Sequence, residues 1–286
     1  MADLTSSGPP APLVGVFDSG LGGLSVLGAL RRQRPDARLL YLADSGHAPY
    51  GERTDDFVID RSLRIAGHLR DQGAGLLVMA CNTATAVAAR RVRERWPDIP
   101  VVGVEPAIKP AVRASAGRIG VMATPVTLRS EKFRQLLEAH GHGADILLQP
   151  CPGLAGLIEQ GDLDALPLLD LIEAQCRPLR EAGVDTVVLG CTHYPFVRQH
   201  IQAAMGPAVR LIDTAEAVAR QASKLLGEAR PAASPSASGT GTGDRATADA
   251  NPPPAQLLTT GDVSHLERVA RSWLGFPFEV AAAPGV

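Results

Sequence analysis

Two cysteines stand at matching places in the sequence and could carry out acid–base chemistry together. Cys81 lies in the motif A-C-N-T and Cys191 in the motif G-C-T-H, each directly after a short apolar run. A thiol has an ordinary pKa of about 8.5, so near neutral pH it can accept a proton as the thiolate or donate one as the thiol. Two thiols on opposite sides of one carbon atom could remove its proton from one face and return a proton to the other. The pair therefore indicates inversion of a stereocentre without a redox step.

Polar residues follow both cysteines and also follow the first apolar run of each half of the chain. The Asn, Thr and His side chains after the cysteines, together with helix N-terminal amides, could hold a carboxylate, so the expected substrate is an acid. Ser19 and Thr124 are 105 residues apart, and we expect both beside the thiols. Asp18 has no acidic counterpart at Ala123. It could contact a substrate ammonium group or accept a proton from Cys81, and a turn or helix cap is the alternative.

The four cysteines of the chain could also be structural. Buried cysteine is common as a small core residue, and we interpret Cys151 and Cys176 in this way, because neither occupies a place like that of the other two. No C-x-x-C pair is present, so neither a zinc ribbon nor a thioredoxin-like motif is indicated. His193 could join Cys191 on zinc, but a third and a fourth ligand are not evident, and we predict no metal.

Lysines and glycines give little support for a cofactor. A pyridoxal-phosphate racemase needs a lysine for a Schiff base; of the three lysines only Lys109 lies near a predicted strand end, without a phosphate-binding glycine loop beside it. Glycines at positions 20, 22 and 23 suggest a dinucleotide site, but Ser25 stands where G-x-G-x-x-G requires its last glycine. We therefore predict that the reaction needs no cofactor.

Eight short apolar, β-branched runs predict the strands that position these residues, with helix-like segments between them. The last four runs follow the first four by 106 to 110 residues, which predicts two similar halves. Ligands bind beyond the carboxyl ends of parallel strands. We therefore expect the α/β class: two pseudo-symmetric three-layer α/β domains with mostly parallel sheets and the active site at their interface. The predicted strands are residues 13–17, 39–42, 76–79, 101–104, 119–122, 146–148, 186–189 and 209–212.

The domain boundaries follow from the strands and from one segment of unusual composition. Residues 228–256 contain no Val, Ile, Leu, Met, Phe, Trp or Tyr, so we predict a disordered loop there. Apolar patterning resumes at residue 257, which indicates a return to a folded domain. We assign residues 1–107 to the first domain, completed by residues 214–286, and residues 108–213 to the second.

Charge and hydropathy limit the partners and the compartment. Across 286 residues, 28 Lys and Arg oppose 30 Asp and Glu, and the formal charge of −2 favours neither nucleic acid nor an anionic membrane. No apolar run approaches the roughly 20 residues of a membrane span, and no signal peptide is apparent. We expect a cytoplasmic protein that acts on a small molecule, and the sequence leaves a homodimer open.

Several motifs, in their order along the chain, resemble those of bacterial glutamate racemases in the aspartate/glutamate racemase family. They are V-G-V-F-D-S-G-L-G-G at 14–23, A-D-S at 43–45 leading to P-Y-G at 49–51, A-C-N-T-A at 80–84, G-C-T-H-Y-P at 190–195 and T-T-G-D at 259–262. The resemblance implies interconversion of L- and D-glutamate without a cofactor, supplying D-glutamate for peptidoglycan. It also implies two α/β domains with the active site between them.

The resemblance assigns roles to individual residues. Cys81 is similar to the thiol that handles the α-proton of the D-enantiomer, and Cys191 to the thiol that handles that of the L-enantiomer. Asp18 and His193 resemble their polar assistants, and Glu159 falls where the family has a carboxylate partner for the histidine. Residues that match substrate contacts are Asp18, Ser19, Pro49, Tyr50, Gly51, Asn82, Thr83, Thr124, Thr192 and His193.

Two other functions stay open at this point. A second two-cysteine racemase or isomerase on the same scaffold, such as one for aspartate, would share the thiols and differ in side-chain reach. A carboxylate-binding or regulatory module with structural thiols would bind an acid without exchanging its α-proton.

Overall fold

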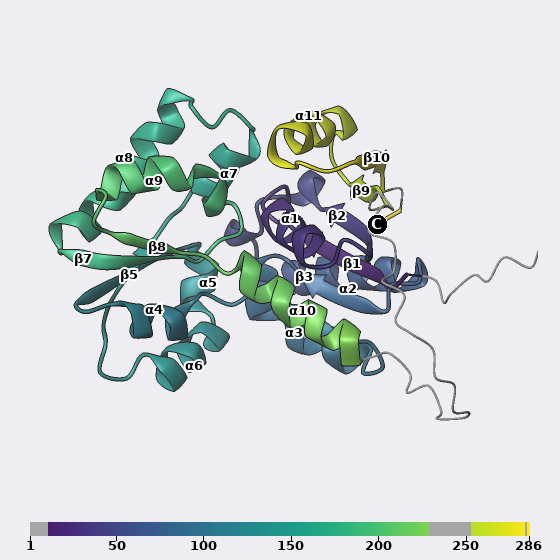
Figure 1. Cartoon of the computed structure of the whole chain (residues 1–286), viewed down its shortest axis with the longest axis horizontal. Helices are drawn as coiled ribbons and strands as arrows, with labels where there is room; N and C mark the ends of the chain where they lie inside the picture. Colours follow the sequence, from purple (N-terminus) through teal and green to yellow (C-terminus); the bar gives the residue numbers. More distant parts are fainter. Residues whose placement is uncertain (1–10, 229–252, 284) are drawn as a thin grey trace, which may run out of the picture.

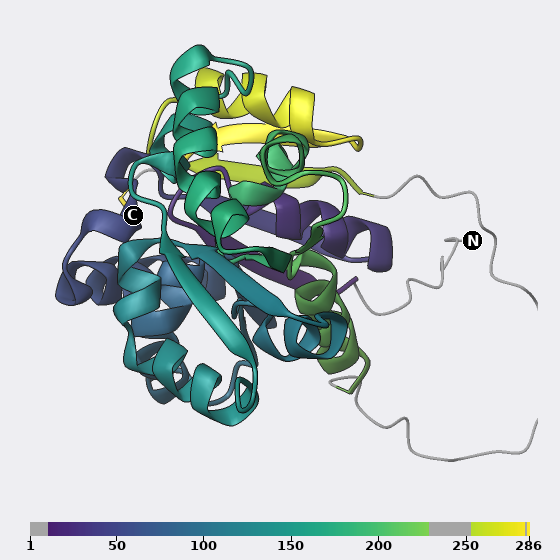
Figure 2. The same cartoon turned by 90° about the vertical axis from the view of Figure 1, so that its left-hand side faces the viewer.

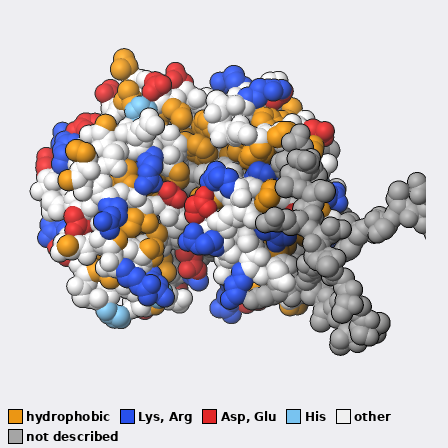
Figure 3. Space-filling view, viewed as in Figure 1, with side chains coloured by type: hydrophobic (Ala, Val, Ile, Leu, Met, Phe, Trp, Pro, Cys, Tyr) orange, Lys and Arg blue, Asp and Glu red, His pale blue; other side chains and the backbone are white. Residues whose placement is uncertain are grey.

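The computed structural model describes residues 11–228, 253–283 and 285–286. It contains two parallel β-sheets in two adjacent lobes, and helices cover both faces of each sheet (Figures 1 and 2). This arrangement confirms the predicted α/β class with two three-layer units. In the described part of the chain, no helix is both long and apolar enough to span a membrane. Basic and acidic side chains are interspersed on the face seen in Figure 3, in keeping with the small net charge.

The two sheets repeat one strand order. The first sheet has the order β10-β9-β2-β1-β3-β4 and the second the order β6-β5-β7-β8, so β2-β1-β3-β4 corresponds to β6-β5-β7-β8. All eight predicted strands are present. Strands of the first sheet are β1 (Leu13–Asp18), β2 (Arg38–Ala43), β3 (Leu76–Met79), β4 (Val101–Gly103), β9 (Ala255–Thr259) and β10 (Phe278–Ala282). Those of the second are β5 (Arg118–Ala123), β6 (Asp145–Pro150), β7 (Val184–Leu189) and β8 (Arg210–Ile212).

Helices bury the two faces of each sheet in separate apolar layers. Successive strand residues alternate between layers: Val14 and Val16 pack on one side of the first sheet and Phe17 on the other. The first sheet is covered by α1 (Leu24–Gln33), α10 (Ala215–Glu228) and α11 (Val263–Trp273) on one face, and by α2 (Asp55–Asp71) and α3 (Asn82–Arg95) on the other. Around the second sheet lie α4 (Ile108–Ala114), α5 (Pro125–Arg129), α6 (Glu131–His140), α7 (Leu154–Glu159), α8 (Leu166–Glu181) and α9 (Arg198–Met205). Short 3-10 turns are η1 (Ser45–His47), η2 (Tyr50–Glu52) and η3 (Tyr194–Val197).

The segment after the predicted loop rejoins the first sheet. β9 pairs in parallel with β2 and β10, and α11 lies between β9 and β10 in the chain. The ends of the predicted loop 228–256 belong to regular elements. Glu228 is the last residue of α10. Ala255 and Gln256 begin β9, because backbone pairing with β10, joined by β2 from Gln256 onward, extends the strand beyond its apolar residues. The remainder of the predicted loop, residues 229–252, lies outside the described residues.

Candidate active site

The carboxyl ends of strands from both sheets meet at one cavity of about 200 Å³. Its size is below the roughly 300–1,000 Å³ of pockets for drug-sized ligands, which suits a small metabolite. Ser19 follows β1, Cys81 follows β3, Thr124 follows β5 and Cys191 follows β7. The two predicted thiols therefore open onto the same space. The other predicted residues that line it are Pro49, Tyr50, Gly51, Asn82, Thr83, Glu159, Thr192 and His193.

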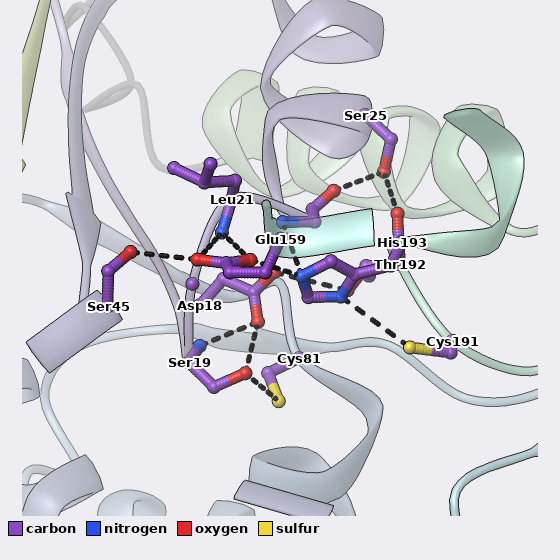
Figure 4. Close-up of polar contacts among 12 residues, drawn as sticks. Asp18, Ser19, Leu21, Ser25, Ser45, Cys81, Glu159, Cys191, Thr192 and His193 are labelled. Carbon is purple, nitrogen blue, oxygen red and sulfur yellow. Dashed lines mark hydrogen bonds and ion pairs between the residues drawn. The ribbon is translucent and has the colours of Figure 1, made fainter. Parts of the chain in front are cut away.

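Cys81 begins a hydrogen-bonded chain that leads away from the cavity. Its sulfur accepts a hydrogen bond from the Ala84 amide at 3.4 Å, which caps the N-terminus of α3. The thiol donates to Ser19 Oγ at 3.6 Å, and Ser19 Oγ donates to Asp18 Oδ1 at 3.1 Å. Thr192 of the other half donates to Asp18 Oδ2 at 3.1 Å. Asp18 is fully buried and does not line the cavity, so it reaches the reaction space through Ser19 (Figure 4).

Burial and negative charge keep the Cys81 side protonated. Burial raises the pKa of Cys81, and the charge of Asp18 raises it further. Burial also raises the pKa of Asp18, an effect that the nearby His193 charge opposes. Cys81 is therefore favoured as a thiol, the form that can donate a proton.

Cys191 faces a histidine–carboxylate pair instead. Its sulfur lies 3.7 Å from His193 Nδ1, and His193 Nε2 lies 2.6 Å from Glu159 Oε2. The first half of the chain holds Glu159 in place (Figure 4). The Leu21 amide donates to its two carboxylate oxygens at 3.1 and 2.9 Å, and Ser45 Oγ donates to Oε1 at 2.9 Å.

The His193–Glu159 pair is favoured in its charged form. Burial lowers the pKa of His193, but Cys191 and Glu159 outweigh it and hold that pKa well above the ordinary value of 6.5. Burial raises the pKa of Glu159, but the hydrogen bond and charge of His193 bring it below 4.5. The imidazolium therefore lies 3.7 Å from the Cys191 sulfur, where its positive charge can oppose negative charge that forms there during a proton transfer.

The glycines after Asp18 make room for this pair. A Cβ atom on Gly20 would lie 2.3 Å from Glu159 Oε1, and one on Gly22 would lie 2.3 Å from His193 Nδ1. Close approach between the two halves therefore requires glycine at both positions. The glycines at positions 20, 22 and 23 were visible in the sequence, but they did not reveal which side chains approach them.

A buried ion pair supports the predicted substrate-contact residues 49–51. Asp44 accepts hydrogen bonds from Tyr50 Oη at 2.5 Å, from Arg61 Nε at 2.9 Å and from Thr260 Oγ1 at 2.8 Å. Burial raises the pKa of Asp44, but its hydrogen bonds, first that from Arg61, bring it below 3.8. Sequence reasoning gave Asp44 and Arg61 no role. The available signal was the spacing of Arg61, three residues after Val58 and four before Ile65, which places it on the buried side of α2.

Cys151 corrects the interpretation of the other two cysteines. β6 extends to Pro150, so Cys151 also follows a strand end, and it lines the cavity. Its side chain also packs in the apolar layer between the second sheet and helices α7 and α8. Cys176 is fully buried in that layer, and burial raises its pKa to about 12. All four cysteines are free. Lining residues that sequence reasoning did not select are Ser45, Ala48, Glu52, Pro125, Cys151, Pro152, Gly153, Ala155 and Gly156.

Among the residues that the structure describes, no group of three or more His, Cys, Asp and Glu side chains is placed to hold a metal ion. Lys109 is exposed on α4 and is not part of the cavity lining. The chemistry that the cavity offers is proton transfer by its thiols and their polar neighbours.

Comparisons with known proteins agree with this geometry. The chain is 48% identical over 263 residues to a glutamate racemase of Ralstonia pickettii, covering 92% of this chain and 88% of the relative. It is 53% identical over 215 residues to one from Pseudomonas putida strain W619, covering 74% and 81%.

Solved structures give the same relationship. A glutamate racemase of Escherichia coli, in complex with L-glutamate and the activator UDP-MurNAc-Ala, superposes with a TM-score of 0.81 at 31% identity, covering 96% of this chain and 98% of that one. A Bacillus anthracis isoform gives a TM-score of 0.81 at 30% identity, covering 97% and 99%. The sequence profile of the Asp/Glu/hydantoin racemase family matches residues 25–222. The chain belongs to the Asp/Glu/hydantoin racemase family.

Proposed function

We propose that this protein is an isomerase that interconverts L- and D-glutamate by proton transfer between Cys81 and Cys191. The observation that carries the proposal is the placement of two buried thiols, from equivalent strand ends of two sheets, on one small cavity. The relatives named glutamate racemase support the choice of substrate. Supply of D-glutamate for peptidoglycan is the corresponding physiological role.

The geometry supports a two-base mechanism. With L-glutamate, the Cys191 thiolate removes the α-proton: the C–H bond breaks, an S–H bond forms, and the electron pair stays on the α-carbon. The Cys81 thiol then protonates that carbon from the opposite face and becomes a thiolate. The D-to-L direction reverses both steps. The imidazolium of His193 stabilises charge on one sulfur, and Ser19 and Asp18 form the path by which Cys81 exchanges its proton.

Binding of the two substrate carboxylates is assigned to the polar rim of the cavity. Asn82 and Thr83 form the N-terminus of α3, where backbone amides and the helix dipole favour an anion. Thr83 Oγ1 lies 3.1 Å from Thr124 Oγ1 of the other half, so both hydroxyls can face one carboxylate. We place the remaining contacts at Ser19, Pro49, Tyr50, Gly51, Thr192 and His193, which line the same space. Asp18 acts behind Ser19 as a proton acceptor.

The test is α-proton exchange in deuterated water, followed by NMR with no added cofactor and under reducing conditions. We expect wild-type protein to exchange and invert both enantiomers of glutamate and to leave aspartate unchanged. We expect Cys81→Ser and Cys191→Ser to lose racemisation by about 10³-fold, within the range of a lost general acid or base. Cys176→Ala is the matched control, because it removes a thiol from the core without reaching the cavity.

Three outcomes would contradict the proposal. Full racemisation by either cavity cysteine variant would exclude the two-thiol mechanism. Inversion of aspartate in place of glutamate would assign the other substrate. Binding of acidic amino acids without exchange in the wild type would indicate a carboxylate-binding module.

The cytoplasm is the compartment we propose, because a reaction between two thiols requires both to be reduced. We also propose the domain division at residues 107/108 and 213/214, which assigns one sheet to each unit. For the assembly, a homodimer is the form to test by static light scattering of the purified chain.

A further inference from the structure

A side chain of helix α11 contacts the backbone of Glu159, the residue that pairs with His193 beside Cys191. His265 lies on α11, in the segment that follows residues 229–252, and its Nε2 is 2.7 Å from the carbonyl oxygen of Glu159. Glu159 is the last residue of the short helix α7, where carbonyl groups have no partner within the helix. The contact therefore holds, through its backbone, the residue whose carboxylate pairs with His193.

Arg268 fixes which nitrogen of His265 carries the proton. Its Nη2 lies 2.6 Å from His265 Nδ1, and a guanidinium can only donate, so Nδ1 is the acceptor. In the neutral ring the proton then sits on Nε2, which donates to the Glu159 carbonyl. The three residues form a chain of two hydrogen bonds: Arg268 donates to His265, and His265 donates to the backbone carbonyl of Glu159.

Close packing makes this contact part of the fold. Gly161, two residues after Glu159, has φ of +87°, and a Cβ there would lie 2.7 Å from Val269 Cγ2 of α11. The chain therefore turns directly against α11 in a conformation that favours glycine. His265 is half-buried at this contact, and its own amide donates to Asp262, which caps α11.

We propose that His265 is a positioning residue for proton transfer at Cys191. It touches neither the cavity nor a thiol. It acts by fixing the end of α7, so that the Glu159 carboxylate stays in line with His193 and His193 stays beside the Cys191 sulfur. This inference rests on the proposed racemisation and extends the machinery of one thiol to the C-terminal segment.

Primary isotope effects test the inference, because they distinguish the two proton transfers. Two enantiomers have equal free energy in water, so a change in either step alters kcat/KM equally in both directions. Slower transfer at Cys191 makes that step more rate-limiting. The deuterium isotope effect on kcat/KM then rises with α-deuterated L-glutamate and falls toward 1 with the D-enantiomer.

For His265→Ala we expect kcat/KM to fall roughly tenfold, less than the roughly 10²-fold that a 1 Å misplacement of a reacting group can cost. We expect the isotope effect to rise with L-glutamate only. His265→Gln should restore most of the activity, because its amide nitrogen can donate to the same carbonyl. His200→Ala is the matched control: His200 is also half-buried but pairs with Asp164, away from the cavity.

A second variant keeps the test decisive if His265→Ala does not fold. Arg268 is exposed, so Arg268→Gln leaves the packing intact and removes the charged donor to Nδ1. We expect a smaller loss with the same asymmetry of isotope effects. Activity within twofold of wild type in folded His265→Ala, or in Arg268→Gln where His265→Ala does not fold, would overturn the inference. Equal changes of both isotope effects in these variants would also overturn it. Absence of glutamate racemisation in the wild type would instead contradict the proposed function.

Discussion

Cys81 and Cys191 occupy equivalent places in equivalent sheets, yet their neighbours have opposite charge. The Cys81 thiol leads through Ser19 to the buried carboxyl group of Asp18, and its pKa is raised. The Cys191 sulfur faces His193, whose pKa is held well above 6.5. An acidic neighbour therefore disfavours the thiolate of Cys81, whereas a charged imidazolium lies beside the Cys191 sulfur. A repeated scaffold places the thiols symmetrically, and single substitutions at repeated positions make them chemically different.

The positions that create this difference can be identified in the repeat. Asp18 corresponds to Ala123, and His193 corresponds to Thr83. Each assistant is then held by the opposite half. Thr192 donates to Asp18, while Ser45 and the Leu21 amide donate to Glu159. The asymmetry depends on contacts between the halves as much as on the residues themselves.

Among substitutions that leave both thiols in place, removal of the Asp18 carboxylate should have the largest effect. Asp18→Asn keeps the size of the side chain but removes the carboxylate at the end of the hydrogen-bonded chain from Cys81 through Ser19. We expect kcat to fall by about 10²- to 10³-fold. The isotope effect should rise with α-deuterated D-glutamate, opposite in direction to that expected for His265→Ala. An unchanged rate would show that Cys81 works without this carboxylate.

Glu159→Gln tests the other side and should cost about 10²-fold in kcat/KM. Glu159 is one of the groups that raise the pKa of His193, so its loss lowers that pKa. The alkaline limit of the pH–rate profile should therefore move to lower pH. Profiles of kcat/KM between about pH 6 and 10 check this, and an unmoved alkaline limit would separate His193 from the reaction.

The free energy of unfolding should also depend on pH through His193 and Glu159. The raised pKa of His193 contributes stability that is present below the ordinary value of 6.5 and is lost as pH rises through the folded value. The lowered pKa of Glu159 contributes stability present above 4.5 and lost as pH falls through its folded value. The difference in unfolding free energy between wild type and Glu159→Gln should therefore shrink at alkaline pH, as measured by urea unfolding.

Gly22→Ala should have the smallest effect, because it disturbs the pair without removing a charged group. The added methyl would meet the His193 ring, and we expect about a tenfold loss of activity and about 1–3 kcal/mol of destabilisation. Gly28→Ala on α1 is the matched control. Its methyl would meet Arg32 Nη1 at 3.5 Å and Leu274 Cδ2 at 4.0 Å, both ordinary contacts, and alanine favours a helix by up to about 1 kcal/mol. Equal behaviour of the two variants would contradict the role assigned to Gly22.

Much of the fold and part of the site could be predicted from the sequence. Eight of the ten strands in the described residues followed from apolar runs, since a run of apolar, β-branched residues is recognisable from neighbouring residues alone. The ends of residues 228–256 did not follow, because Ala255 joins a strand through backbone pairing that composition does not reveal.

Contacts between distant segments account for the other omissions. The Asp44–Arg61 pair, the place of Cys151 at the cavity and the approach of Gly20 to Glu159 depend on how separate segments pack. Local periodicity carries no information on such packing. The motifs could therefore indicate which residues react, but the structure was needed to identify what holds them.

The hydrogen bonds across the junction tie the support of each thiol to the opposite lobe. Thr192 to Asp18 serves one thiol and Ser45 to Glu159 serves the other, and each bond joins the two halves. Each thiol and its assistant belong to the same half, so the junction contributes the orientation of the two assistants. A substitution that shifts one lobe against the other should therefore disturb both proton transfers together, even where it lies far from either sulfur.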